Sequence, residues 1–125
     1  MILDTNALSA YADGDSGAIE SIARTPIVAI PVIVIGEYLF GISQSRQRIG
    51  YERWMNGFVG ASRTLEITAE TAAMYAEIRS EVKRSGTPIP SNDVWIAALC
   101  REHAMPLLSK DRHFDVVKGI RRIEW

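Results

Sequence analysis

The chain has 125 residues, of which 47% are apolar and 23% are charged, and this is the composition of an ordinary globular domain. Its formal net charge of −1 provides no general positive field, so any contact with nucleic acid must rest on local patches, a metal ion or a partner. The single cysteine, Cys100, excludes an internal disulfide and suits a reducing compartment. No apolar run is long enough to cross a bilayer, and the first residues lack a signal-peptide pattern. We therefore expect one cytoplasmic domain, residues 1–125, without membrane contact.

Short apolar runs alternate with helical patterns along the chain. Strands are predicted over 1–3, 27–30, 65–67, 106–109 and 120–123, and helices over about 7–12, 16–23, 32–47, 48–60, 69–84 and 94–103. Asp15 or Ser16 can cap the second helix, Thr68 suits the cap of the fifth, and Gly86 suits the left-handed turn that closes it. The alternation predicts an α/β fold with three layers, in which a parallel sheet of four to five strands lies between helices.

Four acids occupy comparable places in this pattern. Asp4 and Asp111 each follow a predicted strand. Glu37 lies about two turns into the helix after the second strand, and Asp93 lies in the first turn of a later helix. Because ligands bind at the carboxyl ends of parallel strands, we expect the four carboxylates to converge on one cleft.

Converging carboxylates repel one another unless a positive charge neutralises them. Mg²⁺ prefers oxygen ligands and keeps several waters, so it suits such a cleft. The chemistry typical of this arrangement is metal-assisted hydrolysis of a phosphodiester. The two histidines, His103 and His113, show no zinc-site spacing with other ligands.

Each acid also has an ordinary structural alternative. Asp4 could be a helix N-cap, and Asp111 could be a turn residue. Asp93 could complement a helix dipole, although Ser91 is the better candidate for the cap and leaves Asp93 free. Glu37 could be a solvated surface charge, but apolar neighbours on both sides make a site more consistent with the sequence.

The sequence resembles the PIN domain and, within it, the VapC-type ribonuclease toxins. Four segments carry the resemblance, namely Leu3-Asp4-Thr5-Asn6, Ile35-Gly36-Glu37, Pro90-Ser91-Asn92-Asp93-Val94-Trp95-Ile96-Ala97-Ala98 and Leu108-Ser109-Lys110-Asp111-Arg112-His113-Phe114. Together they span nearly the whole chain, and Ser109 stands where threonine is commoner in the family. The resemblance implies a single PIN domain with the predicted α/β/α architecture.

The resemblance also implies a function. It indicates a Mg²⁺- or Mn²⁺-dependent endoribonuclease that is homodimeric, is held inactive by a VapB-type antitoxin and reaches operator DNA only through that antitoxin. Asp4, Asp93 and Asp111 would hold metal directly or through water, and Glu37 would bind metal or position the attacking water. Thr5 and Asn6 would support Asp4 or contact the scissile region of the RNA, and Asp115 would be a possible fifth acid.

Basic residues gather near the end of the chain. Lys110 and Arg112 flank Asp111, and Arg121 and Arg122 follow shortly after. We expect Lys110 and Arg112 above all to contact substrate phosphates, because they adjoin the predicted site.

Other functions fit the sequence less well. A FitB-like PIN protein would act mainly as a partner-dependent DNA-binding complex with little nuclease activity, and the partner would supply the DNA contacts. Haloacid-dehalogenase-like phosphatases also open with a strand-borne Asp but need a second Asp two residues on, where this chain has Asn6. A receiver domain needs a phosphoacceptor Asp after its third strand, where this chain has Thr68.

Overall fold

All five strands of the computed structural model, which describes residues 1–125, form one parallel sheet in the order β3-β2-β1-β4-β5. The strands are β1 (Ile2–Leu3), β2 (Ala29–Pro31), β3 (Arg63–Leu65), β4 (Leu107–Leu108) and β5 (Arg122–Ile123). The helices are α1 (Thr5–Ala12), α2 (Ser16–Ala23), α3 (Val32–Ile42), α4 (Arg48–Gly60), α5 (Ala69–Arg84) and α6 (Ser91–His103), with a 3₁₀ helix over Arg112–Val116.

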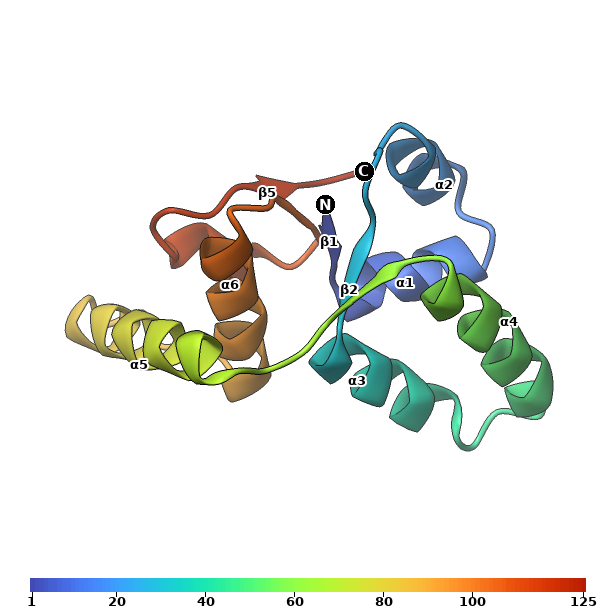
Figure 1. Cartoon of the computed structure of the whole chain (residues 1–125), viewed down its shortest axis with the longest axis horizontal. Coiled ribbons are helices and arrows are strands. Elements are labelled where there is room, and N and C mark those ends of the chain that lie inside the picture. The colour runs from blue at the N-terminus through green and yellow to red at the C-terminus, as the bar shows by residue number, and fades with distance from the viewer.

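Helices cover the sheet on both sides. Figure 1 shows α5 and α6 packed side by side at one end of the molecule, while α1 to α4 lie at the other end, with the strands between them. This confirms the predicted three-layer α/β/α fold with a parallel sheet. None of the helices combines the length and the apolar character that crossing a bilayer demands.

The direction of strand order reverses beside the first strand. From β1 the chain adds β2 and then β3 on one side, and it returns through α5 and α6 to place β4 on the other side of β1. Such a reversal leaves a crevice at the carboxyl ends of the two strands, which is where open α/β sheets bind ligands. The residues that follow β1 and β4 are therefore brought together, and the Asp4 amide donates to the Leu108 carbonyl oxygen at 3.1 Å.

The two strands at this reversal are the most deeply buried part of the sheet. Ile2, Leu3, Leu107 and Leu108 are wholly inaccessible to solvent, because helices cover both faces of the central strands. Helix α6 is also buried on several sides, as its nearly continuous apolar run predicts. Burial raises the pKa of the Cys100 thiol to about 12, which agrees with the expectation of an inert packed cysteine.

Three strands begin two residues away from the predicted start, and one of them is β5, which begins at Arg122 rather than at residue 120. β2 starts at Ala29, which pairs with Ile2, and Ile27 remains 54% exposed, so the prediction that the whole run 27–30 is covered on both faces was wrong. β3 lies at Arg63–Leu65 rather than 65–67, because Arg63 pairs with Ala29 in register. Sheet register therefore overrides local hydrophobicity at the edge of the sheet.

Helix termini follow the predicted caps in most places. Asp15 caps α2 through a bond from the Ala18 amide, and Thr68 forms a capping box with Thr71 at the start of α5. The expectation that Ser91 caps α6 was wrong: Ser91 is the first helical residue, and the cap position belongs to Pro90, which offers no side-chain bond.

Helix α3 is shorter than its sequence pattern suggests. It ends at Ile42 rather than near Gln47, and the Ser43 hydroxyl donates back to the Phe40 carbonyl oxygen at 2.7 Å. A serine side chain that satisfies a terminal carbonyl in this way competes with continuation of the helix.

Candidate active site

Asp4 lies at the carboxyl end of the central strand and is only 5% exposed. Its Oδ1 accepts from the Thr5 amide at 2.8 Å, so it caps α1 as the structural alternative supposes. Its Oδ2 accepts from the Asn6 side-chain amide at 2.9 Å and from the Ser109 hydroxyl at 2.6 Å. Asp4 can therefore cap α1 and also serve in a functional site, because the capping bond holds its carboxylate where the strand order reverses.

Ser109 joins the ends of the two central strands. Its side chain is fully buried, and besides donating to Asp4 its Oγ accepts from the Asp111 amide at 2.9 Å and from the Asn6 side-chain amide at 3.2 Å. The Lys110 amide donates to Asn6 Oδ1 at 3.2 Å. These bonds hold the segment after β4 against the start of α1.

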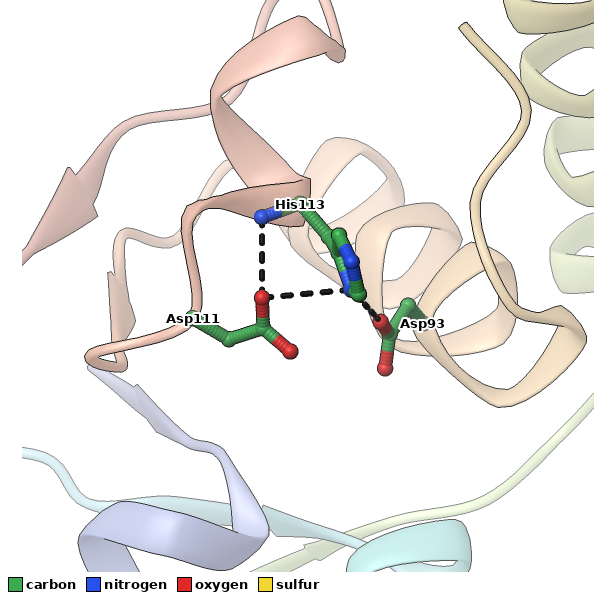
Figure 2. Close-up of side chains that lie close together, drawn as sticks. All are labelled: Asp93, Asp111 and His113. Carbon is green, nitrogen blue, oxygen red and sulfur yellow. Dashed lines mark hydrogen bonds and ion pairs between the residues drawn. The ribbon is translucent and has the colours of Figure 1, made fainter.

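Asp93 and Asp111 approach one another on either side of His113. Figure 2 shows the His113 ring between the two carboxylates, one carried by α6 and the other by the segment after β4. The His113 Nδ1 lies 3.2 Å from Asp93 Oδ2 and 3.2 Å from Asp111 Oδ1. One ligand atom from each of the three side chains lies within 4.8 Å of the others.

Glu37 reaches the same region from α3. Its Oε2 accepts from the Thr5 hydroxyl at 3.1 Å, and its Oε1 accepts from the Asn92 side-chain amide at 3.2 Å. Asn92 immediately precedes Asp93, and Thr5 immediately follows Asp4. Glu37 is thus hydrogen-bonded to one residue next to Asp4 and to one residue next to Asp93, so it is not an isolated surface charge.

Together these contacts form one continuous network, called here the acid network, that passes through all four predicted acids. In order it comprises Asp93, His113, Asp111, Ser109, Asp4, Thr5, Glu37 and Asn92. Its members come from the residue that follows β1, from α1, α3 and α6, and from the segment after β4. The group of side chains that could bind a metal ion contains Asp93, Asp111 and His113, while Asp4 and Glu37 are joined to it through hydrogen bonds.

The surroundings of Asp4 and Asp93 disfavour the ionised forms of these two carboxylates when no cation is bound. Burial, assisted by the charges of Glu37 and Asp111, raises the pKa of Asp4, although its bonds from Ser109 and Thr5 oppose the change. Burial likewise raises the pKa of Asp93 to about 6, with further contributions from the charges of Asp111 and Asp4 and a partly opposing hydrogen bond from His113.

Stability without metal should therefore fall as the pH rises. In the unfolded chain Asp93 has its usual pKa of 3.8, whereas in the folded protein it keeps its proton until about pH 6. The folded state therefore binds more protons than the unfolded state between these two pH values. We expect the denaturation midpoint of the wild type in EDTA to decrease between pH 4 and pH 6 relative to that of Asp93→Asn. A pH profile identical in the two proteins would contradict the assigned burial of Asp93.

The donor chemistry of the acid network fits a hard divalent cation. Asp4 and Glu37 form no salt bridge, and Asp93 and Asp111 pair only with His113, so no lysine or arginine neutralises the group. Carboxylate oxygens are the ligands that Mg²⁺ and Mn²⁺ prefer, and an imidazole nitrogen is acceptable to Mn²⁺. Asp93 and Asp111 belong to the cluster whose ligand atoms lie within 4.8 Å of one another, so they could hold the ion directly.

The predicted basic and peripheral residues lie in different settings. Lys110 places its Nζ 4.5 Å from the centroid of the Trp125 ring, and Arg112 is exposed. Asp115 pairs with Arg122 through contacts of 2.7 and 3.0 Å, and this guanidinium holds the pKa of Asp115 below its usual range. The structure therefore gives Asp115 an arginine partner, which none of the four acids of the network has.

Three members of the acid network were not assigned a role from the sequence. His113 enters the sequence analysis only within a motif and as a histidine without zinc-site spacing, while Ser109 and Asn92 appear only within longer motifs. A usable signal was present for His113, because it follows Asp111 by two residues where a tight turn returns the side chain toward the preceding carboxylate, and its amide donates to Asp111 Oδ1 at 2.9 Å. The bond between Ser109 and Asp4 joins residues 105 positions apart, which no local pattern reveals.

Comparison with known proteins identifies the family. The family model for the PIN domain matches residues 1–120. The chain belongs to the PIN-domain family. The resemblance seen in the sequence is thus confirmed, and the curated relatives of this PIN domain are of VapC type. One of these, Ribonuclease VapC2 of Rickettsia felis, is 28% identical over 129 residues, which cover 99% of this chain and 96% of that protein.

Solved structures agree with the fold of this PIN domain. The DNA-bound VapBC structure from Salmonella typhimurium superimposes with a TM-score of 0.88 at 24% identity, covering 99% of this chain and 96% of that one. FitAcB from Neisseria gonorrhoeae gives a TM-score of 0.86 at 22% identity, covering 98% of this chain and 95% of that one. At this level of identity the similarity establishes the shared fold.

Proposed function

We propose that this PIN domain is a metal-dependent endoribonuclease and the toxin of a VapBC-type pair, acting in the cytoplasm. The observation that carries the proposal is the acid network, in which four carboxylates from separate segments meet with no lysine or arginine to neutralise them. Membership of the PIN family and the ribonuclease name of the Rickettsia felis relative support the same activity.

In this proposal each residue has a distinct task. Asp93 and Asp111 hold Mg²⁺ or Mn²⁺, and Asp4 contributes directly or through a water, while Glu37 binds metal or orients the attacking water. The bound cation would activate that water and stabilise the charge that develops on the phosphate. Thr5 and Asn6 orient Glu37 and Asp4. Lys110 and Arg112, which flank Asp111 in the sequence, would contact the phosphates of the RNA.

Cleavage of RNA by the purified protein tests this function. We expect hydrolysis with Mg²⁺ or Mn²⁺, complete loss with excess EDTA and recovery when the metal is restored. Activity that persists in EDTA would contradict a metal-dependent mechanism.

Ser109 should affect activity without contacting RNA. Ser109→Ala removes the donor to the buried Asp4 carboxylate, and loss of such a supporting bond typically costs about 10- to 100-fold in metal affinity or activity. The measurement is the Mn²⁺ concentration required for half-maximal cleavage. Ser109→Thr keeps the hydroxyl and should recover most of the loss, whereas an unaffected Ser109→Ala protein would exclude this positioning role.

We further propose a VapB-type antitoxin as the partner, a homodimeric assembly, and contact with operator DNA only through the antitoxin. The fold is shared with the toxin subunits of VapBC complexes, one of them solved with DNA bound, and the net charge of −1 gives this chain no general affinity for DNA. The experiment is co-purification with the product of an adjacent short gene, followed by a DNA-binding assay with and without that partner.

A second candidate function is a FitB-like regulatory complex with little nuclease activity. The similarity to FitAcB favours it to the same extent as the similarity to VapBC, because both rest on the fold. Expression of this chain alone separates the two functions. Growth arrest that disappears in Asp93→Ala supports the nuclease, and unaffected growth with a soluble wild-type protein supports the regulatory complex.

A further inference from the structure

A hollow of about 410 Å³ adjoins the acid network on the face of α3. It is lined by Val32, Ile33, Gly36, Glu37, Phe40 and Asn92. The volume falls within the range of about 300–1,000 Å³ typical of small-molecule sites. Glu37 and Asn92 belong to both the hollow and the acid network, so an occupant of the hollow would lie directly beside the proposed scissile phosphate.

Phe40 forms an exposed aromatic wall of this hollow. Its side chain is 82% exposed, more than any other large apolar residue of the chain, whereas Tyr38 two positions earlier is buried. The core therefore does not use the Phe40 ring. An exposed aromatic ring beside a cleft for RNA is the usual platform on which an unpaired base stacks.

The rest of the lining of the hollow is open and partly polar. A Cβ added at Gly36 would meet no atom within 4 Å, so packing of the fold does not require glycine at this position. The missing side chain leaves this space open to a ligand. Asn92 donates one amide hydrogen to Glu37. Because Asn92 is exposed, its second amide hydrogen and its side-chain carbonyl oxygen are available to a ligand. A planar ring with hydrogen-bonding groups on its edge could stack on the Phe40 ring and bond to the Asn92 amide at the same time.

We propose that this hollow binds the base of a nucleotide next to the cleaved phosphodiester, with Phe40 stacking on the base and Asn92 reading its edge. The inference rests on the proposed ribonuclease function and adds a specificity subsite to it. The hollow shares Glu37 and Asn92 with the acid network, and this continuity with the proposed cleavage site favours a nucleotide as its occupant.

Binding of single-stranded RNA in EDTA tests the subsite without cleavage. The probe is a fluorescein-labelled RNA decamer of mixed sequence, and the background variant is Asp93→Asn. Phe40→Ala should weaken binding about 5- to 150-fold, the loss expected from removal of one stacked base, whereas Phe40→Trp should retain it. Removal of the base at one position of the decamer should reproduce the loss, and that abasic RNA should bind the Phe40→Ala protein no worse than the intact RNA does.

Filling the hollow gives an independent test. Gly36→Leu places a side chain in the hollow and should weaken binding of the decamer to a similar degree. Gly57→Leu on α4 is the matched control, because a Cβ there also meets nothing within 4 Å and the residue lies outside the hollow. Thermal denaturation of the two leucine variants verifies that both remain folded.

The outcomes separate the subsite from the nuclease function. Unchanged affinity in Phe40→Ala and Gly36→Leu overturns the subsite even if the wild type cleaves RNA. Failure of the wild type to cleave RNA overturns the nuclease, while the binding measurements still decide on the subsite. Conversion of a dimer to a monomer by Phe40→Ala, with no dependence on any base of the decamer, would assign the hollow to a second copy of the chain and overturn the proposal.

Discussion

Replacing Asp93 by alanine should lower the rate of metal-dependent RNA cleavage by about 1,000-fold, because several kcal/mol of charge stabilisation at the phosphate depend on the bound ion. Asp93 shares the candidate metal-binding cluster with Asp111 and His113. The measurement is single-turnover cleavage of a labelled RNA at saturating Mn²⁺. Asp93→Asn keeps the shape of the side chain and should show most of the same loss, which would identify charge rather than packing as the cause.

Asp115→Asn provides the matched control for this experiment. Asp115 lies in the same segment as Asp111 but pairs with Arg122, so its substitution should leave cleavage within a few-fold of the wild type. Full activity in Asp93→Ala, with metal dependence retained, would refute the assignment of the site. A large loss in Asp115→Asn would instead restore Asp115 as the fifth acid.

A divalent cation should stabilise the folded protein strongly. At a concentration 100 times its dissociation constant, an ion that binds only the folded state adds about 2.7 kcal/mol to the free energy of unfolding. For a domain of this size this corresponds to a rise in melting temperature of roughly 10 °C. The physical reason is that the ion neutralises two carboxylates, Asp4 and Asp93, whose pKa is raised chiefly by burial and further by the charges of neighbouring acids.

Differential scanning calorimetry with MnCl₂, and with KCl at equal ionic strength, measures this effect. The double variant Asp93→Asn, Asp111→Asn should melt at a higher temperature than the wild type in EDTA and should gain little from Mn²⁺. An equal gain in the wild type and the double variant would place the ion elsewhere.

The fold class and the positions of the four acids could be predicted because both depend on local patterns. Apolar runs that end in an acid locate the strands, and parallel strands share one edge, so Asp4 and Asp111 meet without knowledge of the contacts between them. The strand edges could not be predicted as well. Ile27 belongs to an apolar run but lies outside β2, because pairing with β1, and not hydrophobicity, determines where that strand begins.

The supporting contacts of the site could not be predicted from local patterns at all. Ser109 bonds to Asp4 and Thr5 bonds to Glu37 only because the sheet order places distant segments side by side. The exposed Phe40 shows the same limit, because an apolar residue on an apolar helix is expected to pack, and only the structure shows that the core does not need it.

The order of the strands also has a consequence for biosynthesis. The first half of the chain carries Asp4 and Glu37, but β4 pairs with β1 only after more than a hundred residues have been made. A nascent chain on the ribosome therefore lacks Asp111, Ser109 and His113 until translation is nearly finished. Such non-local pairing also slows folding. The proposed nuclease site is therefore complete only at the end of synthesis, and the proposed antitoxin would have this interval in which to bind the new chain.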